Sequence, residues 1–219
     1  MIITFSGVDG CGKSTLISLL KDKLSAYSNQ QVILRRSRPS YLPILSSFVL
    51  GKTKAEERAG IMLPRKGHNK SVVSSYIRFF YYLSDYIVGG FLLRLKYPHN
   101  KYVILYDRYY FDYIVDPKRF NLVIDQKFVN LIYKLFIPKA EVNFFVFCNE
   151  ELVLTRKNEL QRNEIVDLNE GFGQLFNRNG VSNGFYVVEN LDSPIENAVE
   201  EIINILKNDK KSFLLFSKN

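Results

Sequence analysis

The sequence predicts a three-layer α/β domain built on a five-stranded parallel sheet. Five short and continuously apolar runs recur along the chain, which is the pattern of strands that are buried on both faces. Segments with helical spacing separate these runs, and this alternation indicates right-handed crossovers that cover both faces of the sheet with helices. The five predicted strands lie at residues 1–6, 31–37, 102–106, 142–148 and 184–190.

The helices in the first half of the chain follow from apolar spacing and from helix-breaking residues. Leucine and isoleucine recur at helical intervals over residues 13–27, directly after the first strand. The aromatic-rich segment 72–96 predicts a long helix that ends before Pro98. Between the second strand and this helix, prolines break regular structure. Within that region, residues 51–60 are expected to form an exposed loop or a short helix.

The second half of the chain repeats the alternation. Helical spacing over residues 126–137 precedes the fourth strand, and residues 150–160 begin a helix after it. The last predicted helix, 193–207, has Ser193 at its N-cap and Pro194 at its first position, which are favoured residues there. These elements complete the predicted order of five strands with intervening helices.

Length and composition predict one folded domain. With 219 residues, of which 47% are apolar and 24% charged, the chain has the composition of an ordinary folded protein. We expect a single domain over residues 1–207 and a basic tail over 208–219, either solvated or in contact with a membrane surface or partner. The net charge of +8 is scattered and no nucleic-acid-binding motif is present. A small anionic substrate is therefore expected, and no nucleic-acid partner.

Cysteine usage and the apolar segments predict a cytoplasmic protein. Cys11 and Cys148 lie far apart and lack the spacing of a zinc site or a disulfide framework. The N-terminus has no basic region before its apolar run, unlike a signal peptide. Charged residues interrupt the apolar segment 79–95, so a buried helix is favoured over a membrane span. Its surplus apolar surface could pack on a second subunit, which makes a homodimer an expectation.

The segment FSGVDGCGKSTL, residues 5–16, carries the strongest chemical signal. Gly7, Gly12, Lys13 and Ser14 fit the Walker A pattern G-x-x-x-x-G-K-[ST], between a predicted strand and a predicted helix. Such a loop directs backbone N–H groups at phosphates, while the lysine reaches the β- and γ-phosphates and the hydroxyl ligates Mg²⁺. The alternative is a glycine turn before an ordinary helix. The predicted nucleotide-binding residues are Gly7, Asp9, Gly10, Cys11, Gly12, Lys13, Ser14 and Thr15.

A second polar pair follows the third predicted strand. Asp107 and Arg108 come directly after the apolar run 102–106, at the edge of a parallel sheet where ligands bind. An aspartate there is suited to hold Mg²⁺ through water, and an arginine to bind a phosphate. Ser14 and Asp107 are accordingly the predicted metal residues. The alternative is a simple surface ion pair between the two side chains.

With these motifs the chain resembles the thymidylate kinase family of P-loop kinases over most of its length. FSGVDGCGKST corresponds to the family's D-G-x-G-K-[ST] loop, YDRYY to its D-R-Y motif, and VVENLDSPIENAVEEI to its C-terminal strand and helix. The resemblance implies a P-loop NTPase fold with a small helical lid. It also implies an ATP- and Mg²⁺-dependent kinase that transfers the γ-phosphoryl group to a nucleoside monophosphate, with dTMP as the default.

The resemblance also assigns roles to individual residues. Lys13 and Ser14 match the positions that bind ATP and Mg²⁺, Asp9 the loop acid near the acceptor's sugar hydroxyl, and Arg108 the arginine that positions the acceptor phosphate. Arg38 matches an arginine-proline element after the second strand, for which Arg35 or Arg36 is an alternative. Positive charge is needed around the oxygens of a phosphoryl group in transfer.

The predicted lid spans about residues 155–166. Arg156 and Arg162 resemble the family's lid arginines; the alternative is a solvated helical face paired with Glu159 or Glu164. The catalytic residues that the resemblance implies are Lys13, Asp9, Arg108 and Arg156.

The acceptor half of the family pattern is altered in this chain. Asp112 stands where the family has a serine, and Asp85-Tyr86 where it has an Asp-Arg pair, for which Arg78 could substitute. The predicted acceptor-binding residues are Arg38, Arg78, Arg108 and Asp112. Two further hypotheses follow: a P-loop kinase of another small molecule, such as a sugar or an envelope precursor, and a nucleotide-binding regulator without turnover. The aromatic residues Tyr109, Tyr110, Phe111 and Tyr113 could stack on a base, but core packing is the commoner fate.

Overall fold

The computed structural model describes residues 1–28, 30–43, 71–157, 159–191 and 193–209, together with Ser212 and Leu215. The loop or short helix predicted at residues 51–60, and most of the predicted tail, lie outside the described residues. The chain divides into two compact units, and the prediction of a single domain over 1–207 stays a prediction. The sheet unit comprises Met1–Ser37, Lys96–Tyr109 and Lys139–Asn219; the helical unit comprises Arg38–Leu95 and Tyr110–Pro138.

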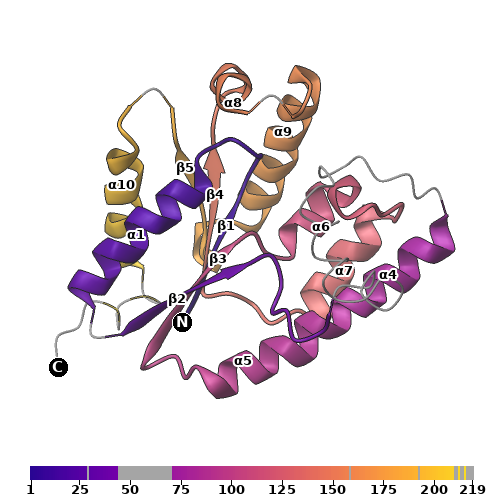
Figure 1. The fold of residues 1–219 in the computed structure, drawn as a ribbon, viewed down its shortest axis with the longest axis horizontal. Coiled ribbons are helices and arrows are strands. Elements are labelled where there is room, and N and C mark those ends of the chain that lie inside the picture. Colours follow the sequence, from indigo (N-terminus) through magenta and orange to yellow (C-terminus); the bar gives the residue numbers. More distant parts are fainter. Residues whose placement is uncertain are drawn as a thin grey trace. The chain divides into compact units, whose positions relative to one another are not determined.

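The sheet unit is built on five parallel strands in the order β2-β3-β1-β4-β5 (Figure 1). The central strand β1 pairs with β3 on one side and β4 on the other, so that Ile3 lies opposite both Leu105 and Val142. All residues of β1 are buried, as expected for a strand covered on both faces. The predicted five-stranded parallel sheet is confirmed. The strands are β1 Ile2–Ser6, β2 Gln31–Arg36, β3 Tyr102–Asp107, β4 Val142–Phe147 and β5 Phe185–Glu189.

Helices flank this sheet. Figure 1 shows α1 and α10 together on one side of it and α9 on the other. Leu16, Leu20 and Leu24 of α1 are fully buried, because residues four apart lie on the same face of a helix. The helical elements of the sheet unit are α1 Lys13–Tyr27, α8 Glu150–Arg156, α9 Arg162–Asn179, the 3₁₀-helix η3 Val181–Asn183 and α10 Ile195–Asn208.

The start of α10 corrects the sequence prediction. The helix begins at Ile195, and its N-cap is Pro194 rather than Ser193. Pro194 has φ −53° and ψ 135°. Its ring fixes φ at a helical value, but ψ is extended, so the helix starts one residue later than predicted.

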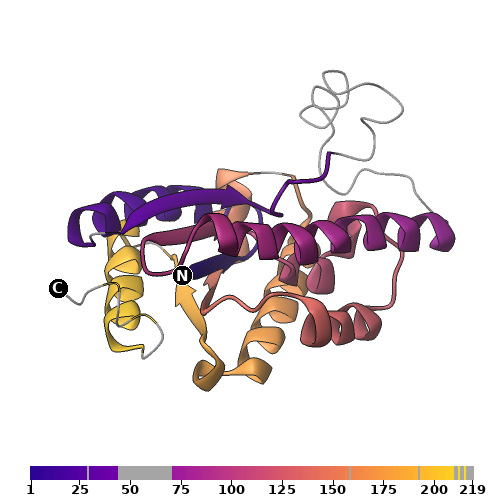
Figure 2. The same cartoon turned by 90° about the horizontal axis from the view of Figure 1, so that it is seen from below.

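The described part of the helical unit contains one long helical rod and three short elements. Figure 2 shows the rod as a continuous helix in magenta. The predicted helix 72–96 is interrupted by a π-helical turn at its centre, η1. The rod consists of α4 Val72–Ser84, η1 Asp85–Gly89 and α5 Gly90–Lys96; the other elements are α6 Phe111–Val115, the 3₁₀-helix η2 Pro117–Phe120 and α7 Gln126–Phe136.

Aromatic rings form the interior of the helical unit. The Tyr86 ring meets those of Tyr110 and Tyr113 edge-on, with centroids 5.5 and 5.9 Å apart. Tyr110 and Tyr113 are buried, together with Phe111, so the interpretation of these residues as core is confirmed. Burial raises the pKa of Tyr110 and Tyr113 well above the usual value, so both phenols stay protonated at every physiological pH.

No helix in the described part of the chain is long and apolar enough to cross a membrane. The cytoplasmic location stays a prediction. Both cysteines are buried and neither forms a disulfide.

Candidate functional site

The loop between β1 and α1 has the predicted strand-loop-helix context. Gly7 (φ 143°) and Gly12 (φ 88°) have positive φ. A Cβ atom on Gly7 would lie 2.5 Å from the carbonyl oxygen of Val146, and one on Gly12 would lie 2.3 Å from Asn190 Nδ2. Glycine is therefore needed at both positions for the loop to pack against β4 and the end of β5. No side chain caps the N-terminus of α1, which suits its first N–H groups to an anion.

The Lys13 side chain lies inside this loop. Its Nζ donates to the carbonyl oxygens of Gly7 at 2.8 Å and Val8 at 2.6 Å, and to Cys11 Sγ at 3.3 Å. The residue is only 5% exposed. A buried ammonium held by carbonyl dipoles places a full positive charge within the loop, where phosphates would bring negative charge.

The two predicted metal residues lie together. Ser14 Oγ, at the start of α1, donates to Asp107 Oδ2, at the end of β3, at 3.0 Å. Hydroxyl and carboxylate oxygens are ligands that Mg²⁺ prefers, so this pair fits a magnesium ion. Within the described ranges, no three His, Cys, Asp or Glu side chains gather to hold a metal. Phosphate and water oxygens would supply the further ligands, as is usual for nucleotide-bound Mg²⁺.

Arg108 joins the same cluster through the loop acid. Its guanidinium forms an ion pair with Asp9, and its NH1 donates to the Gly7 carbonyl oxygen at 3.3 Å. The backbone N–H of Arg108 donates to the Phe5 carbonyl at 2.8 Å, which continues the β1–β3 ladder. Arg108 also has φ 74°, an unusual conformation for a residue with a side chain. Such backbone strain persists only where the surroundings hold it, and it is concentrated at functional sites.

The predicted lid arginines have different surroundings. Arg156, at the end of α8, donates to Cys148 Sγ at 3.6 Å, and its NH1 would lie 3.7 Å from a Cβ on Gly12. Arg162, at the start of α9, pairs with Glu150 at 3.2 Å and Glu151 at 2.9 Å. Arg156 therefore borders the glycine-rich loop, whereas Arg162 forms its ion pairs with the first two residues of α8. Its partners are not the Glu159 or Glu164 considered from sequence.

Asn190 is a site residue that sequence reasoning missed. Its side-chain Nδ2 donates to the Cys11 carbonyl oxygen at 2.8 Å, and the residue is 2% exposed. Because the carbonyl and the next N–H of a planar trans peptide point in opposite directions, this bond turns the Gly12 N–H away from Asn190. The signal available was its position: Asn190 directly follows β5, at the carboxyl edge of the sheet.

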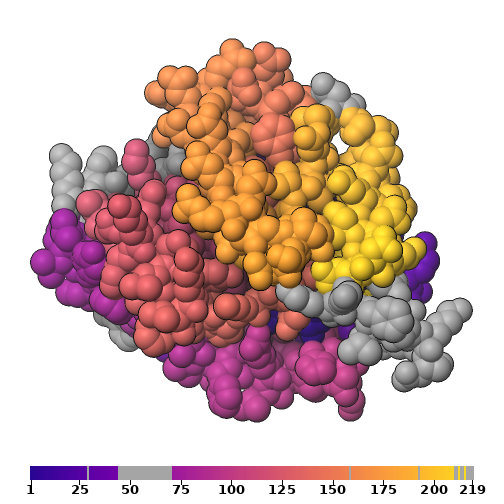
Figure 3. Space-filling view, turned by 180° about the vertical axis from the view of Figure 1, so that it is seen from behind, coloured from indigo at the N-terminus to yellow at the C-terminus, as the bar shows by residue number. Residues whose placement is uncertain are grey.

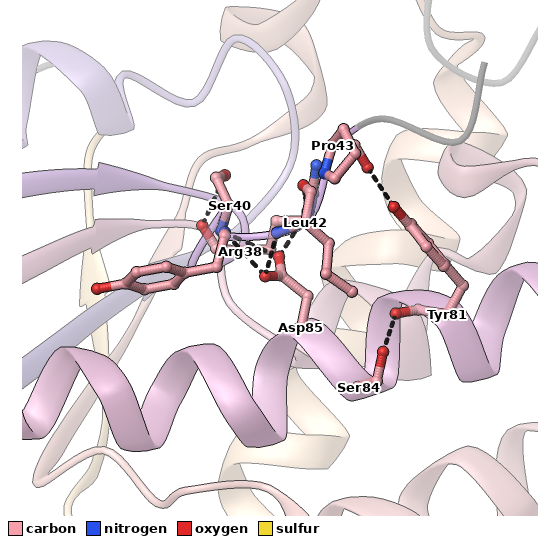
Figure 4. Close-up of polar contacts among 8 residues, drawn as sticks. Arg38, Ser40, Leu42, Pro43, Tyr81, Ser84 and Asp85 are labelled. Carbon is pink, nitrogen blue, oxygen red and sulfur yellow. Dashed lines mark hydrogen bonds and ion pairs between the residues drawn. The ribbon is translucent and has the colours of Figure 1, made fainter. Parts of the chain in front are cut away.

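The remaining predicted acceptor residues lie in the helical unit. Arg38 NH1 donates to Asp85 Oδ2 at 2.5 Å and to the Leu42 carbonyl oxygen at 2.7 Å, as Figure 4 shows. Arg78 is half-buried on α4 and forms no ion pair with another described residue. Asp112 is fully buried in the first turn of α6. Because Arg108 belongs to the sheet unit, the four-residue acceptor site stays a prediction.

Arg35 and Arg36, the alternatives to Arg38, have different surroundings. Arg35 NH2 donates to the Tyr97 hydroxyl at 3.5 Å, within the sheet unit, and its guanidinium lies 5.9 Å from the Tyr97 ring centre. Arg36 is exposed at the end of β2. Of the three arginines, only Arg38 is held by a buried carboxylate.

Comparison with known proteins identifies the fold. No protein-family model and no curated protein matches the sequence. Among solved structures, thymidylate kinase from Ehrlichia chaffeensis matches with a TM-score of 0.63 and 18% identity, over 94% of this chain and 98% of that chain. Thymidylate kinase from Candida albicans matches with a TM-score of 0.60 and 18% identity, over 96% and 92% of the respective chains. The chain has the thymidylate kinase fold, a P-loop α/β fold, with a strongly diverged sequence.

Replacing Asn190 with alanine should weaken nucleotide binding. Loss of a hydrogen bond worth about 1 kcal/mol frees the peptide between Cys11 and Gly12, so we expect the Kd for Mg-ATP to rise roughly fivefold. Isothermal titration calorimetry measures this. The matched control is Asn183→Ala in η3, which removes an amide donor bonded to the Asn179 carbonyl at the end of α9. Equal Kd values for the folded Asn190→Ala variant and the wild type would contradict the assigned role.

Proposed function

We propose that this protein is an ATP-dependent phosphotransferase that transfers the γ-phosphoryl group of ATP to a nucleoside monophosphate, with dTMP as the first candidate. The observation that carries the proposal is the shared Gly7 carbonyl oxygen, which accepts from both Lys13 and Arg108. A lysine suited to the donor phosphates and an arginine suited to an acceptor phosphate are thus joined at one backbone group. The likeness in fold to two thymidylate kinases supports the same proposal.

On the donor side, the loop N–H groups and Lys13 bind the β- and γ-phosphates. Ser14 and Asp107 would hold Mg²⁺ at this site. The ion, when bound there, neutralises charge on the phosphate oxygens. Arg156, which borders Gly12, adds positive charge near the transferred group.

On the acceptor side, Arg108 binds the phosphate and Asp9 fixes the guanidinium. The Asp9 carboxylate is also a suitable acceptor for a hydrogen bond from a sugar hydroxyl. The acceptor oxygen then attacks the γ-phosphorus in line as the bond to the bridging oxygen of ADP breaks, without a covalent enzyme intermediate. Positioning and charge neutralisation supply the catalysis.

A second candidate function is phosphorylation of another small molecule. Two residues favour it: Tyr86, which replaces the family's arginine and is buried among aromatic rings, and Asp112, which puts a buried acid in place of a serine. Both changes alter the hydrogen-bonding groups offered to an acceptor, and a site that lacks a substrate's polar partner rejects that substrate. The Candida albicans thymidylate kinase has broad substrate specificity, so breadth of acceptor is compatible with the fold.

The function is tested with purified protein, Mg-ATP and a panel of acceptors that includes dTMP, dUMP, other nucleoside monophosphates and sugars. We expect diphosphate to form from a nucleoside monophosphate. Lys13→Ala should lower kcat more than 100-fold, roughly 3 kcal/mol, because it removes the cation at the transferred group. The matched control is Lys23→Ala, a half-buried lysine of the same helix that pairs with Glu200.

Three other results would replace this proposal. Turnover of a sugar or envelope precursor without turnover of any nucleoside monophosphate would establish the second candidate function. ATP binding without turnover of any acceptor would indicate the regulator. Full activity in the Lys13→Ala variant would contradict the role given to the phosphate loop.

Replacing Arg108 with alanine separates acceptor binding from ATP binding. A charged hydrogen-bonding group contributes about 1.5–3 kcal/mol, so the KM for the monophosphate should rise roughly 10- to 150-fold. The Kd for ATP should change less than about threefold, because Arg108 contacts the Gly7 carbonyl and the Asp9 carboxylate of the donor loop, and the Lys13 ammonium remains in place. Steady-state kinetics with calorimetry measures both. An equal loss of ATP affinity would contradict the assignment.

We also propose that the protein forms a homodimer through the rod α4–η1–α5. Figure 3 shows part of this segment, in magenta, at the molecular surface. In α4, and again from η1 into α5, exposed apolar residues recur every three or four positions, the spacing of one helical face, and such a face is suited to pair with its own copy in a two-fold interface. These residues include Val73, Ile77, Phe80, Val88, Phe91 and Leu95.

The dimer is tested by sedimentation. We expect a dimer at micromolar concentration, and a monomer after Ile77→Glu or Phe91→Glu, because burying an unpaired charge at the interface is costly. Val181→Glu, an equally exposed apolar position in the sheet unit, serves as the control. A monomeric wild-type protein at tens of micromolar would contradict the proposal.

A further inference from the structure

The carboxylate of Asp85 is the centre of a dense hydrogen-bond network in the helical unit. Its Oδ2 accepts from Arg38 NH1 at 2.5 Å and from the Ser40 N–H at 3.0 Å, while Oδ1 accepts from the N–H groups of Tyr41 and Leu42, both at 2.9 Å. Figure 4 shows the segment wrapped over this side chain. Three consecutive backbone N–H groups that converge on an anion form the kind of concavity that binds phosphate elsewhere. Here the protein's own buried carboxylate fills it.

The segment 38–42 adopts a conformation that needs this support. Within it, Ser40 has left-handed backbone angles, with φ 62°. Such angles cost of the order of 1 kcal/mol for residues other than glycine and persist only where neighbouring contacts impose them. The bonds to Asp85 supply these contacts. The network therefore fixes a backbone shape that the local sequence alone disfavours.

Gly89, one turn after Asp85, lets the segment lie directly on η1. A Cβ atom on Gly89 would be 2.7 Å from Pro39 Cβ and 3.0 Å from Tyr41 Cδ2. The segment thus packs on the backbone of the π-helical turn, in addition to its bonds to Asp85. Even a methyl group at this position would push it away.

The Arg38 guanidinium is held at one end only. NH1 makes both of its hydrogen bonds, to Asp85 Oδ2 and to the Leu42 carbonyl oxygen, and the group stacks 5.1 Å from the Tyr82 ring centre. Among the described residues, Nε and NH2 have no hydrogen-bond partner. An arginine that is already fixed through one nitrogen and stacked on a ring loses little further conformational freedom when it binds a ligand. Its other nitrogens can still bind an oxyanion in a fork.

We propose that Asp85 is a positioning residue that preorganises Arg38 and the segment 38–42 to bind the phosphate of the acceptor. This inference rests on the proposed function, because it needs an anionic acceptor. Asp85 itself does not touch the acceptor. It orients the guanidinium and sets the segment's shape before binding, so that binding does not have to order them.

The test replaces Asp85 with asparagine. The amide keeps the size of the side chain, but its NH₂ group faces N–H donors, so bonds to the segment are lost. In the nucleotide-free protein, hydrogen exchange of the amides of residues 40–42 should accelerate at least about tenfold, the effect of losing about 1.4 kcal/mol of protection. The KM for the monophosphate should rise by a similar factor. The KM for ATP and kcat should change less than about threefold.

Three further experiments keep the result interpretable. Gly89→Ala displaces the segment without changing any charge, and should reproduce both effects if Asp85→Asn does not fold. Ser84→Ala, which removes only an exposed hydroxyl bonded to the Tyr81 carbonyl on the adjacent turn, should reproduce neither. In an Arg38→Ala background, Asp85→Asn should raise the KM for the monophosphate no further, because the two residues act as a unit.

The outcomes separate this inference from the proposed function. Faster exchange with an unchanged KM for the monophosphate would show that Asp85 has only a structural role, and would overturn the inference. Unchanged exchange would overturn it too, because the network would not be holding the segment. A wild-type protein that turns over no nucleoside monophosphate would overturn the proposed function itself, and the phosphate role of Asp85 with it.

Discussion

The carbonyl oxygen of Gly7 is the group on which the candidate site depends. It accepts from the Lys13 ammonium and from the Arg108 guanidinium, so two buried cations meet at one backbone dipole. Desolvated positive charges are costly unless they are paired or hydrogen-bonded, and only Arg108 has a carboxylate, that of Asp9. Lys13 relies on the loop's own carbonyls. A site arranged in this way is suited to attract phosphate, because the bound anion would supply the negative charge that the loop carbonyls do not provide for Lys13.

The parallel sheet explains why these groups meet. All five strands end at the same edge, and each of four neighbouring strands is followed there by one part of the site. The loop follows β1, Asp107 and Arg108 come at the end of β3, Cys148 follows β4, and Asn190 follows β5. The ladder aligns these ends, with Phe5 opposite Asp107 and Phe147 opposite Glu189. Register, rather than any local motif, therefore sets the distances within the site.

A feature of this structure could be predicted from the sequence where it leaves a local pattern, and could not where it depends on residues far apart in the chain. Buried strands and the phosphate loop leave local patterns, and Ser14 and Asp107 could be paired because both follow parallel strands. The partners of Asn190 and Asp85 could not be found in this way, since they lie 179 and 47 residues away. A side chain that holds a backbone carbonyl or a strained turn shows no periodicity and no motif. The partners of Arg162 were missed for the same reason, because they depend on how α8 and α9 fold back on one another.

The π-helical turn at Asp85–Gly89 has a consequence for how this fold can diversify. A π turn closes with one residue more than an α turn, so a single-codon insertion or deletion can create or remove it. Deleting one residue would restore an uninterrupted α-helix and rotate Asp85 by about 100° relative to everything beyond it. The carboxylate would then leave the segment that it holds. The length of the helical rod would thus distinguish related sequences that retain the fixed arginine from those that have lost it.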